Sequence, residues 1–363
     1  MIIINDTHLS VNRVSGTTPQ SREDLRNCVF AEFDKLLHIA DGHDLAILGD
    51  LFDAFEVAPR DWLQTYLMLA GWCANNPTSD LFLIAGNHDV SSKADKVSSF
   101  ETLCEVLVNQ FGDEQVHQVG IDACEYFGTN LTHPSFYAVA HHRNQELFDL
   151  TLAKVLSSCQ RGDYVLLHAN YDNKFAEQAD HSLNVSEAQA LEFTKKGVDL
   201  LFAHEHHHRR EIPHGTPADG GSVVCLGNQI PTSVSDVLGR ADKFYWELWE
   251  EGLRKHRVWG AEDNYAELDW RSLPQDSHAK FIRVVGDAVN AEAAQVIDAI
   301  HRFRQKSNAF VITNAVKIEG IADIESLPST LEAAKKFDVM EFVYKQLDET
   351  EAALIRKIVG EME

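Results

Sequence analysis

Short apolar segments alternate with helical segments over the first two-thirds of this 363-residue chain. The pattern predicts buried strands at 1–4, 45–48, 81–84, 137–140, 164–167, 200–203 and 223–226. Helices are expected between them, the first with Ser21 as its N-cap and others at 62–73 and 100–111. Strands that alternate with helices predict a layered α/β fold, in which sites form where strands end and loops begin.

A second, smaller domain is expected after residue 262. Strands at 281–285 and 310–318 enclose a helical stretch at 291–303, which is a β-α-β pattern of its own. The following tail carries an apolar stripe, which either packs on its own domain or docks onto a partner. The predicted boundaries are 1–262 for the main domain, 263–325 for the small domain and 326–363 for the helical tail.

Composition excludes several classes of protein. No apolar run approaches the roughly 18 residues of a membrane span, and the first residues lack the basic start of a signal peptide. The six cysteines are scattered without a CxxC pair, which is typical of free thiols in a reducing cytoplasm. The net charge of −24 argues against non-specific DNA binding, unless local basic patches or bound metal ions supply the attraction.

Five of the expected strands are followed directly by aspartate, asparagine or histidine. The segments are Asp6-Thr7-His8, Gly49-Asp50-Leu51-Phe52-Asp53, Gly86-Asn87-His88-Asp89, His168 and His204-Glu205-His206. Any one of them has an ordinary explanation, because aspartate and asparagine favour turns and a lone histidine is commonly a surface or core residue. Their joint occurrence after apolar strands favours one shared site at the edge of a sheet.

The chemistry of these side chains indicates a metal centre. Imidazole nitrogens combined with carboxylate and amide oxygens suit manganese, iron or zinc better than magnesium or calcium. Seven such groups exceed the needs of one ion with an open position, but they match two divalent ions, roughly 3.5–4 Å apart, that share a carboxylate. Such a pair activates a water and clamps a phosphoryl centre, so the predicted reaction is metal-assisted phosphoester hydrolysis.

Together the five segments resemble the signatures of the calcineurin-like metallophosphoesterases, with Ala203 in place of the usual glycine. The resemblance implies a four-layer α-β-β-α sandwich and two divalent ions, with Asp50 as the bridging ligand. It assigns the first ion to Asp6, His8, Asp50 and His206, and the second to Asp50, Asn87, His168 and His204. His88, paired with Asp53, is expected to give a proton to the leaving oxygen or to stabilise the charged transition state.

Within this family the residues from Asn5 to Leu9, from Gly49 to Asp53 and from Ala203 to His206 are most similar to SbcD-type DNA exonucleases, including bacteriophage members, and so is the segment from Leu226 to Ser233. The resemblance implies a DNA nuclease that uses Mn²⁺, or alternatively Fe²⁺ or Zn²⁺, and that acts in DNA repair and recombination, with single-strand endonuclease activity as an addition. It also implies that the small domain contacts DNA and that the tail docks on an SbcC-type ATPase. A homodimer is expected, in the cytoplasm of a bacterium or a phage-infected cell.

Three further residues are candidates for substrate binding. His141 follows the strand at 137–140, and Arg209 and Arg210 come a few residues after the last metal segment. Each has a plain alternative, as a loop histidine or part of a solvated charged face. Asp89 is expected to cap a helix.

Two other functions stay open on the sequence. A phosphoesterase acting on nucleotides or other small phosphodiesters fits the acidic charge more simply. A metal-binding scaffold without catalysis would need the metal ligands but would have no use for His88.

Overall fold

The computed structural model describes residues 1–89, 96–130, 132–173, 183–205, 207–240, 242–260, 264–275 and 277–319. The chain divides into two compact units. The first consists of Met1–Ala266, Ser277–Ile282 and Asn308–Ile312, and the second of Glu267–Asp276, Arg283–Ser307 and the chain from Thr313 onward. The helical tail predicted at 326–363 lies outside the described residues.

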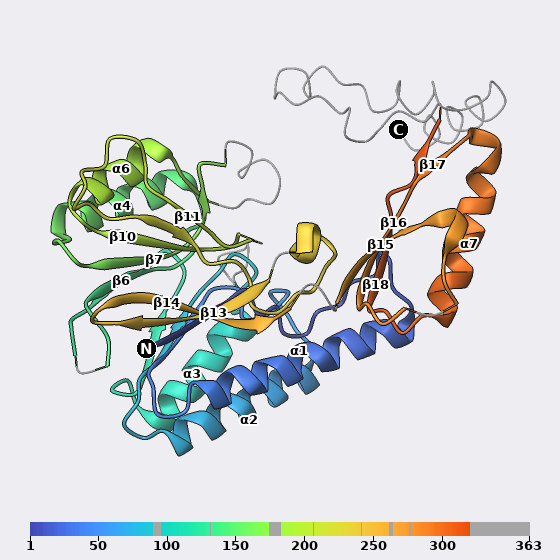
Figure 1. The fold of residues 1–363 in the computed structure, drawn as a ribbon. Coiled ribbons are helices and arrows are strands. Elements are labelled where there is room, and N and C mark those ends of the chain that lie inside the picture. Colours follow the sequence, from blue (N-terminus) through green and yellow to red (C-terminus); the bar gives the residue numbers. More distant parts are fainter. Residues whose placement is uncertain are drawn as a thin grey trace, which may run out of the picture. The chain divides into compact units, whose positions relative to one another are not determined.

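Two six-stranded sheets form the centre of the first unit (Figure 1). The first has the order β14 (Gly252–Trp259), β13 (Lys243–Trp249), β1 (Ile2–Asn5), β2 (Leu45–Leu48), β3 (Leu81–Ile84) and β4 (Val116–Val119). The second has the order β11 (Arg209–Glu211), β12 (Val223–Cys225), β10 (Asp199–Ala203), β7 (Tyr164–His168), β6 (Phe136–Val139) and β5 (Cys124–Phe127). The strands β1 to β4 are parallel, and so are β6, β7, β10 and β12, so their carboxyl ends meet at one edge of each sheet.

Helices cover the outer face of each sheet, which confirms the predicted four-layer α-β-β-α sandwich (Figure 1). The first sheet carries α1 (Pro19–Ile39), α2 (Pro59–Asn75) and α3 (Ser99–Phe111), and the second carries α4 (Gln145–Ser158) and α6 (Glu187–Lys195). One hydrophobic core joins α1–α3, the first sheet and the inner face of the second, and another joins α4 and α6 to its outer face. The short strands β8 (Asn170–Tyr171) and β9 (Asn184–Val185) pair with each other, and η1 (Ser235–Arg240) is a 3-10 helix.

The apolar segments of the sequence locate the central strands closely. All residues of β2 and β3 are buried, because both faces of these parallel strands are covered. The start of α1 differs from the prediction. Thr18 is the N-cap, whereas Ser21 occupies the third helical position and completes a capping box, so the N-cap role predicted for Ser21 is wrong.

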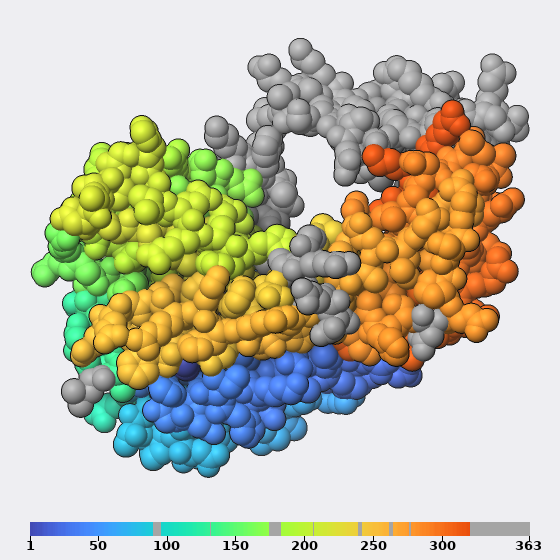
Figure 2. Space-filling view, viewed as in Figure 1, coloured from blue at the N-terminus to red at the C-terminus, as the bar shows by residue number. Residues whose placement is uncertain are grey.

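The hairpin of β13 and β14 is absent from the sequence-based prediction. β13 pairs antiparallel with β1, with Glu247 opposite Ile2, and thereby extends the first sheet beyond the N-terminal strand. Its residues are only partly buried and include Lys243 and Glu247, so no continuous apolar run marks it. In Figure 2 the hairpin forms a golden band at the surface of the first unit, between the blue residues of α1 and the yellow-green residues of the second sheet.

Between residues 264 and 319, the described part of the chain beyond β14 forms one α-helix and two small sheets. β15 (Tyr265–Asp269), β16 (Phe281–Val285) and β18 (Val311–Asn314) make a three-stranded sheet, and β17 (Asp287–Ala288) pairs with β19 (Lys317–Ile318). The helix α7 (Ala293–Lys306) buries Val296, Ile300 and Phe303 along one face, and η2 (Trp270–Ser272) and η3 (Asn290–Glu292) are short 3-10 helices. No helix in the described part of the chain has the length and apolar character needed to cross a membrane.

Candidate metal centre

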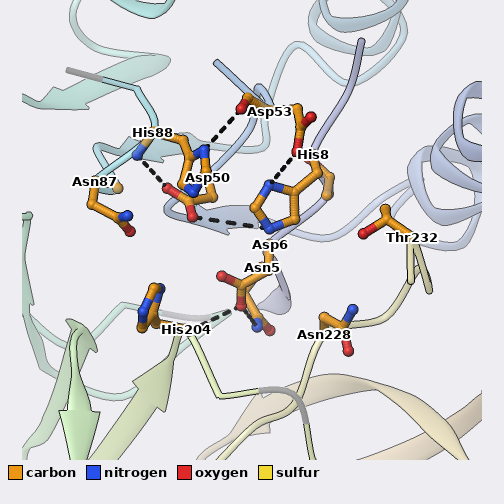
Figure 3. A network of polar contacts seen from close by, with 12 residues as sticks. Asn5, Asp6, His8, Asp50, Asp53, Asn87, His88, His204, Asn228 and Thr232 are labelled. Carbon is orange, nitrogen blue, oxygen red and sulfur yellow. Dashed lines mark hydrogen bonds and ion pairs between the residues drawn. The ribbon is translucent and has the colours of Figure 1, made fainter. Parts of the chain in front are cut away.

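The carboxyl ends of strands from both sheets bring the polar segments together (Figure 3). These are Asp6 and His8 after β1, Asp50 and Asp53 after β2, Asn87 and His88 after β3, His168 at the end of β7, and His204 after β10. Ligand atoms of Asp6, Asp50, His168 and His204 all lie within 4.8 Å of one another, and those of His8, Asp53 and His88 form a second such group. Residues from five strand ends, far apart in sequence, therefore share one site.

The Asp50 carboxylate lies between the two groups. It is fully buried, and its Oδ1 is 3.4 Å from Nε2 of His168, while its Oδ2 is 4.0 Å from Nε2 of His8. The backbone nitrogen of His88 donates to Oδ1 at 2.9 Å. Each carboxylate oxygen thus faces a different imidazole, which places Asp50 between the two groups, as expected of a bridging ligand.

His168 is enclosed by oxygen atoms. Its Nε2 is 2.9 Å from Oδ1 of Asn87, and its Nδ1 is 4.0 Å from Oδ1 of Asp6. Burial alone lowers the pKa of His168, but the charge of Asp50 opposes this and raises that pKa to about 9. The backbone nitrogen of His204 donates to Asp6 at 3.0 Å and ties the second sheet to the first. The amide oxygen, carboxylates and imidazoles of this group converge as ligands would.

His88 differs from its predicted pairing. Its Nδ1 lies 2.8 Å from the backbone carbonyl oxygen of Asp53, whereas the Asp53 carboxylate lies 3.4 Å from Nδ1 of His8. The pairing of His88 with the Asp53 side chain is therefore replaced by a bond to its main chain. The rings of His8 and His88 stand almost perpendicular, with centroids 5.2 Å apart. His206, assigned to the first ion, lies outside the described residues.

Four of these residues have left-handed backbone conformations, which residues other than glycine rarely adopt. The φ angles are 49° at Asp6, 47° at His8, 49° at Asp50 and 74° at His204. Left-handed backbone at a non-glycine residue costs about 1–2 kcal/mol and persists only where the surroundings enforce it. Its concentration at the strand ends marks this edge as the functional one.

Two glycines provide the space that the ligands occupy. A Cβ at Gly49 would lie 2.0 Å from Nδ1 of His168, and a Cβ at Gly86 would lie 2.2 Å from Oδ1 of Asp50. Both distances are far below ordinary contact, so no other residue fits at either position without moving a ligand. These are the glycines that precede Asp50 and Asn87 in the sequence segments.

The residues present fit a pair of divalent cations. Oδ2 of Asp50 and Nδ1 of His168 are buried and have no hydrogen-bond partner among the described residues. A buried polar atom without a hydrogen-bond partner lowers the stability of the fold by about 1–3 kcal/mol. A metal cation can be bound by both carboxylate and imidazole lone pairs, so it would satisfy both atoms. The mixture of imidazoles, carboxylates and one amide oxygen suits transition metals or zinc.

Asp89 has a role that the sequence did not reveal. Its carboxylate is 1% exposed and accepts hydrogen bonds from the backbone nitrogens of Leu51 (3.3 Å), Phe52 (3.1 Å) and Gly86 (3.0 Å). It therefore joins the loop after β2 to the loop after β3. The helix that Asp89 was expected to cap would begin outside the described residues, so that role stays a prediction. Its place in the Gly86–Asp89 segment was the available signal, but Leu51 and Phe52, two of its three partners, are distant in sequence.

The three predicted substrate residues differ in their surroundings. His141 is 6% exposed, and burial together with the nearby His168 lowers its pKa to about 3. The guanidinium of Arg209 lies 3.0 Å from Glu211 and 3.3 Å from Glu205, and it donates to the carbonyl oxygen of Tyr171 at 3.1 Å. Arg210 alternates with it along β11 and belongs to the opposite face of the sheet.

A cavity of about 190 Å³ opens beside the metal ligands. It is lined by Asp6, His8, Arg13, Asp50, His88, His204, Glu205, Asn228, Thr232 and Asp236. Arg13, Asn228, Thr232 and Asp236 were not identified as site residues. Asn228 and Thr232 lie in the segment from Leu226 to Ser233 that resembles SbcD-type exonucleases, whereas no motif includes Arg13 or Asp236. A larger hollow of about 670 Å³ between α1 and α2 is lined by none of the metal-centre residues.

Comparison with known proteins gives one family and several distant structures. The family model of calcineurin-like phosphoesterases matches residues 1–208, whereas no curated protein matches. Similar solved structures include a dimetal phosphatase from Danio rerio, with 11% identity, a TM-score of 0.38, and 71% of this chain and 98% of that chain covered. Phosphopantetheinyl hydrolase from Mycobacterium tuberculosis has 11% identity and a TM-score of 0.37, with 70% and 94% covered. Purple acid phosphatase from yellow lupin has 11% identity and a TM-score of 0.39, with 71% and 51% covered.

Proposed function

The chain belongs to the calcineurin-like phosphoesterase family, and we propose that it is a two-metal phosphodiesterase that hydrolyses DNA in the manner of SbcD-type exonucleases. The observation that carries the proposal is the Asp50 carboxylate, which faces one histidine with each oxygen. Family membership supports phosphoester hydrolysis. The DNA substrate rests on the resemblance of the sequence segments to that branch.

The assignment of ligands to the two ions follows the family resemblance. The structure groups the side chains differently, because Asp6 lies with Asp50, His168 and His204, whereas His8 lies with Asp53 and His88. We assign Asp6, His8, Asp50 and His206 to one ion, and Asp50, Asn87, His168 and His204 to the other. Two ions held by these residues would polarise the phosphoester and activate the attacking water. Mn²⁺ is the proposed metal because of the resemblance to SbcD-type exonucleases, and the mixed imidazole and oxygen ligands would also suit Fe²⁺ or Zn²⁺.

His88 is proposed to give a proton to the leaving oxygen. A carbonyl oxygen only accepts, so Nδ1 of His88 carries a hydrogen toward the Asp53 carbonyl, and Nε2 is left to exchange the proton. Burial lowers the pKa of His88, but the charge of Asp50, the bond to Asp53 and the charge of Asp53 raise it above the usual value. A raised pKa favours the protonated ring, which is the form that a general acid needs.

Partners and context remain proposals of the same kind. The second unit would guide the DNA strand, the tail at 326–363 would dock on an SbcC-type ATPase, and two copies would form a homodimer in the cytoplasm. The acidic charge of −24 favours one alternative, hydrolysis of small nucleotides or other small phosphodiesters.

One assay separates the alternatives. The purified chain is incubated with Mn²⁺ and end-labelled single- and double-stranded DNA, alongside bis(4-nitrophenyl) phosphate. Release of nucleotides from DNA supports the nuclease, whereas turnover of the small diester with inert DNA supports the alternative. Asp50→Ala should lose both metals and all activity, and Arg161→Ala, an exposed surface change, should lose neither.

A further inference from the structure

We propose that Arg13 forms a subsite for a second phosphate of a nucleic-acid strand, beside the phosphoester at the metal centre. The inference rests on the proposed function, because a strand carries further phosphates next to the one that is cut. The sequence segments give Arg13 no role, and its place in the site follows only from the fold.

Arg13 supplies positive charge where the cavity otherwise has little. Among the described residues that line the cavity, it is the one arginine or lysine. The metal ligands hold the scissile phosphate through their ions, and the remaining wall includes the acidic residues Glu205 and Asp236. A neighbouring phosphate therefore finds its favourable contact at Arg13.

One hydrogen bond links the exposed Arg13 side chain to Thr232, which a buried carboxylate anchors in turn. Nη2 of Arg13 donates to Oγ1 of Thr232 at 3.2 Å, and this hydroxyl lies 3.3 Å from Oδ2 of Asp236, to which it donates. Asp236 is 1% exposed and also accepts from the backbone nitrogens of Thr232 (2.7 Å) and Ser233 (2.8 Å). Because a guanidinium has five N–H donors and Thr232 takes one, the group is positioned and still able to bind an anion.

Asn228 offers a second donor on the same wall. Nζ of Lys243, a buried lysine, donates to Oδ1 of Asn228 at 2.6 Å. A lysine only donates, so this contact fixes the orientation of the amide, and Nδ2 donates one hydrogen to the carbonyl of Ile230 at 3.2 Å. Figure 3 shows the amide nitrogen of Asn228 on the side of Thr232, and Asn228 lines the cavity.

Arg209, the earlier candidate for phosphate binding, is less suited to this role. Its guanidinium is already flanked by Glu205 and Glu211 and bonded to the carbonyl of Tyr171. A phosphate at Arg209 would have to approach two carboxylates. The hydrogen-bond partner of Arg13 is instead the neutral hydroxyl of Thr232.

The test compares thymidine dinucleotides that carry only the scissile phosphate with the same dinucleotides bearing a second phosphate at the 5′ or the 3′ end. We expect the native chain to prefer one doubly phosphorylated form. Arg13→Ala should lower kcat/KM for that form by about ten- to a hundredfold and leave the singly phosphorylated substrate unchanged. Thr232→Val should act in the same direction but less, and Arg161→Ala, which removes an exposed arginine bound to Asp219, should change neither.

Binding gives a readout that does not need turnover. For a labelled single-stranded oligonucleotide and metal-depleted protein, Arg13→Ala should reduce the slope of log Kd against log salt by about 0.7, the value for one lost phosphate contact. Equal losses on both classes of dinucleotide would assign Arg13 to the scissile phosphate and overturn the subsite, and so would an unchanged preference and slope. A native chain that cleaves bis(4-nitrophenyl) phosphate but no nucleic acid would overturn the proposed function itself, which is a different result from DNA cleavage insensitive to Arg13.

Discussion

Replacing Gly86 with alanine would place a methyl carbon against the carboxylate that both metal sites share. An ideal Cβ at this position lies 2.2 Å from Oδ1 of Asp50 and 2.3 Å from the backbone nitrogen of Asp50, whereas ordinary contacts begin at 3.4 Å. Rotation of the Asp50 side chain relieves the first clash but leaves the second. The loop after β2 must therefore shift by more than 1 Å, and the bridging carboxylate shifts with it.

The energetic consequence can be bounded. Overpacking of this kind costs about 1–3 kcal/mol, which lowers Tm by roughly 2–12 °C in a unit of this size. The larger effect is expected on function, because a displacement of about 1 Å at a reacting centre can cost a hundredfold in rate. We expect Gly86→Ala to lose most of its bound metal and at least a hundredfold of its phosphodiesterase activity.

Three measurements on one preparation check this expectation: metal content by mass spectrometry, Tm by calorimetry, and turnover of bis(4-nitrophenyl) phosphate. Gly128→Ala is the matched control, since a Cβ at Gly128 meets nothing within 4 Å. A Gly86→Ala protein that binds two ions and turns over at the native rate would refute the steric argument and, with it, the central place given to Asp50.

Three further outcomes are expected. His88→Ala should keep both metals and lose about 10²–10⁴-fold in kcat, measured with metal content on the same samples, and retained activity would contradict the proton-donor role. Asp61→Asn should lower the free energy of unfolding near neutral pH by about 1.5–3 kcal/mol, because it breaks the buried pair with Arg26. Burial raises the pKa of Asp61, but the hydrogen bonds from Arg26 and Ser10 outweigh this effect and lower that pKa. The difference in unfolding free energy between the native chain and Asp61→Asn, measured with urea, should therefore vanish as the pH falls below about 4 and through the lowered pKa. A difference that persists at that pH would contradict the pair. Lys243→Met should leave metal content unchanged and weaken oligonucleotide binding by less than Arg13→Ala, as measured by fluorescence anisotropy, and a larger loss would indicate a direct contact.

The central strands could be predicted because strands that are buried on both faces consist of consecutive apolar residues. β2 and β3 are covered on both faces, so each is an uninterrupted apolar run bounded by polar residues. β13 lacks such a run, since it is partly exposed and carries charged residues. The N-cap of α1 was misplaced because Thr18 and Ser21 both take part in the capping box, and the sequence does not rank them.

The positions of the metal-ligand candidates were predictable for a topological reason. Parallel strands end at a common edge of the sheet, so the residues that follow β1, β2 and β3 lie close together regardless of the loop conformations. Contacts made by backbone atoms or by distant loops carry no such signal. Two contacts depend on loop conformations that only the folded chain defines. They are the hydrogen bond between His88 and the carbonyl oxygen of Asp53, and the hydrogen bond between Arg13 and Thr232.

The pairing of β1 with β13 bears on how the chain reaches its native state during synthesis. Ile2 lies opposite Glu247, so β1 leaves the ribosome long before β13 and keeps an open hydrogen-bonding edge until most of the first unit has been translated. Such a delay favours slow folding and exposes an apolar strand to neighbouring chains, which chaperones ordinarily shield. Shortened chains that end before β13 would accordingly be prone to aggregate even though they contain every candidate metal ligand.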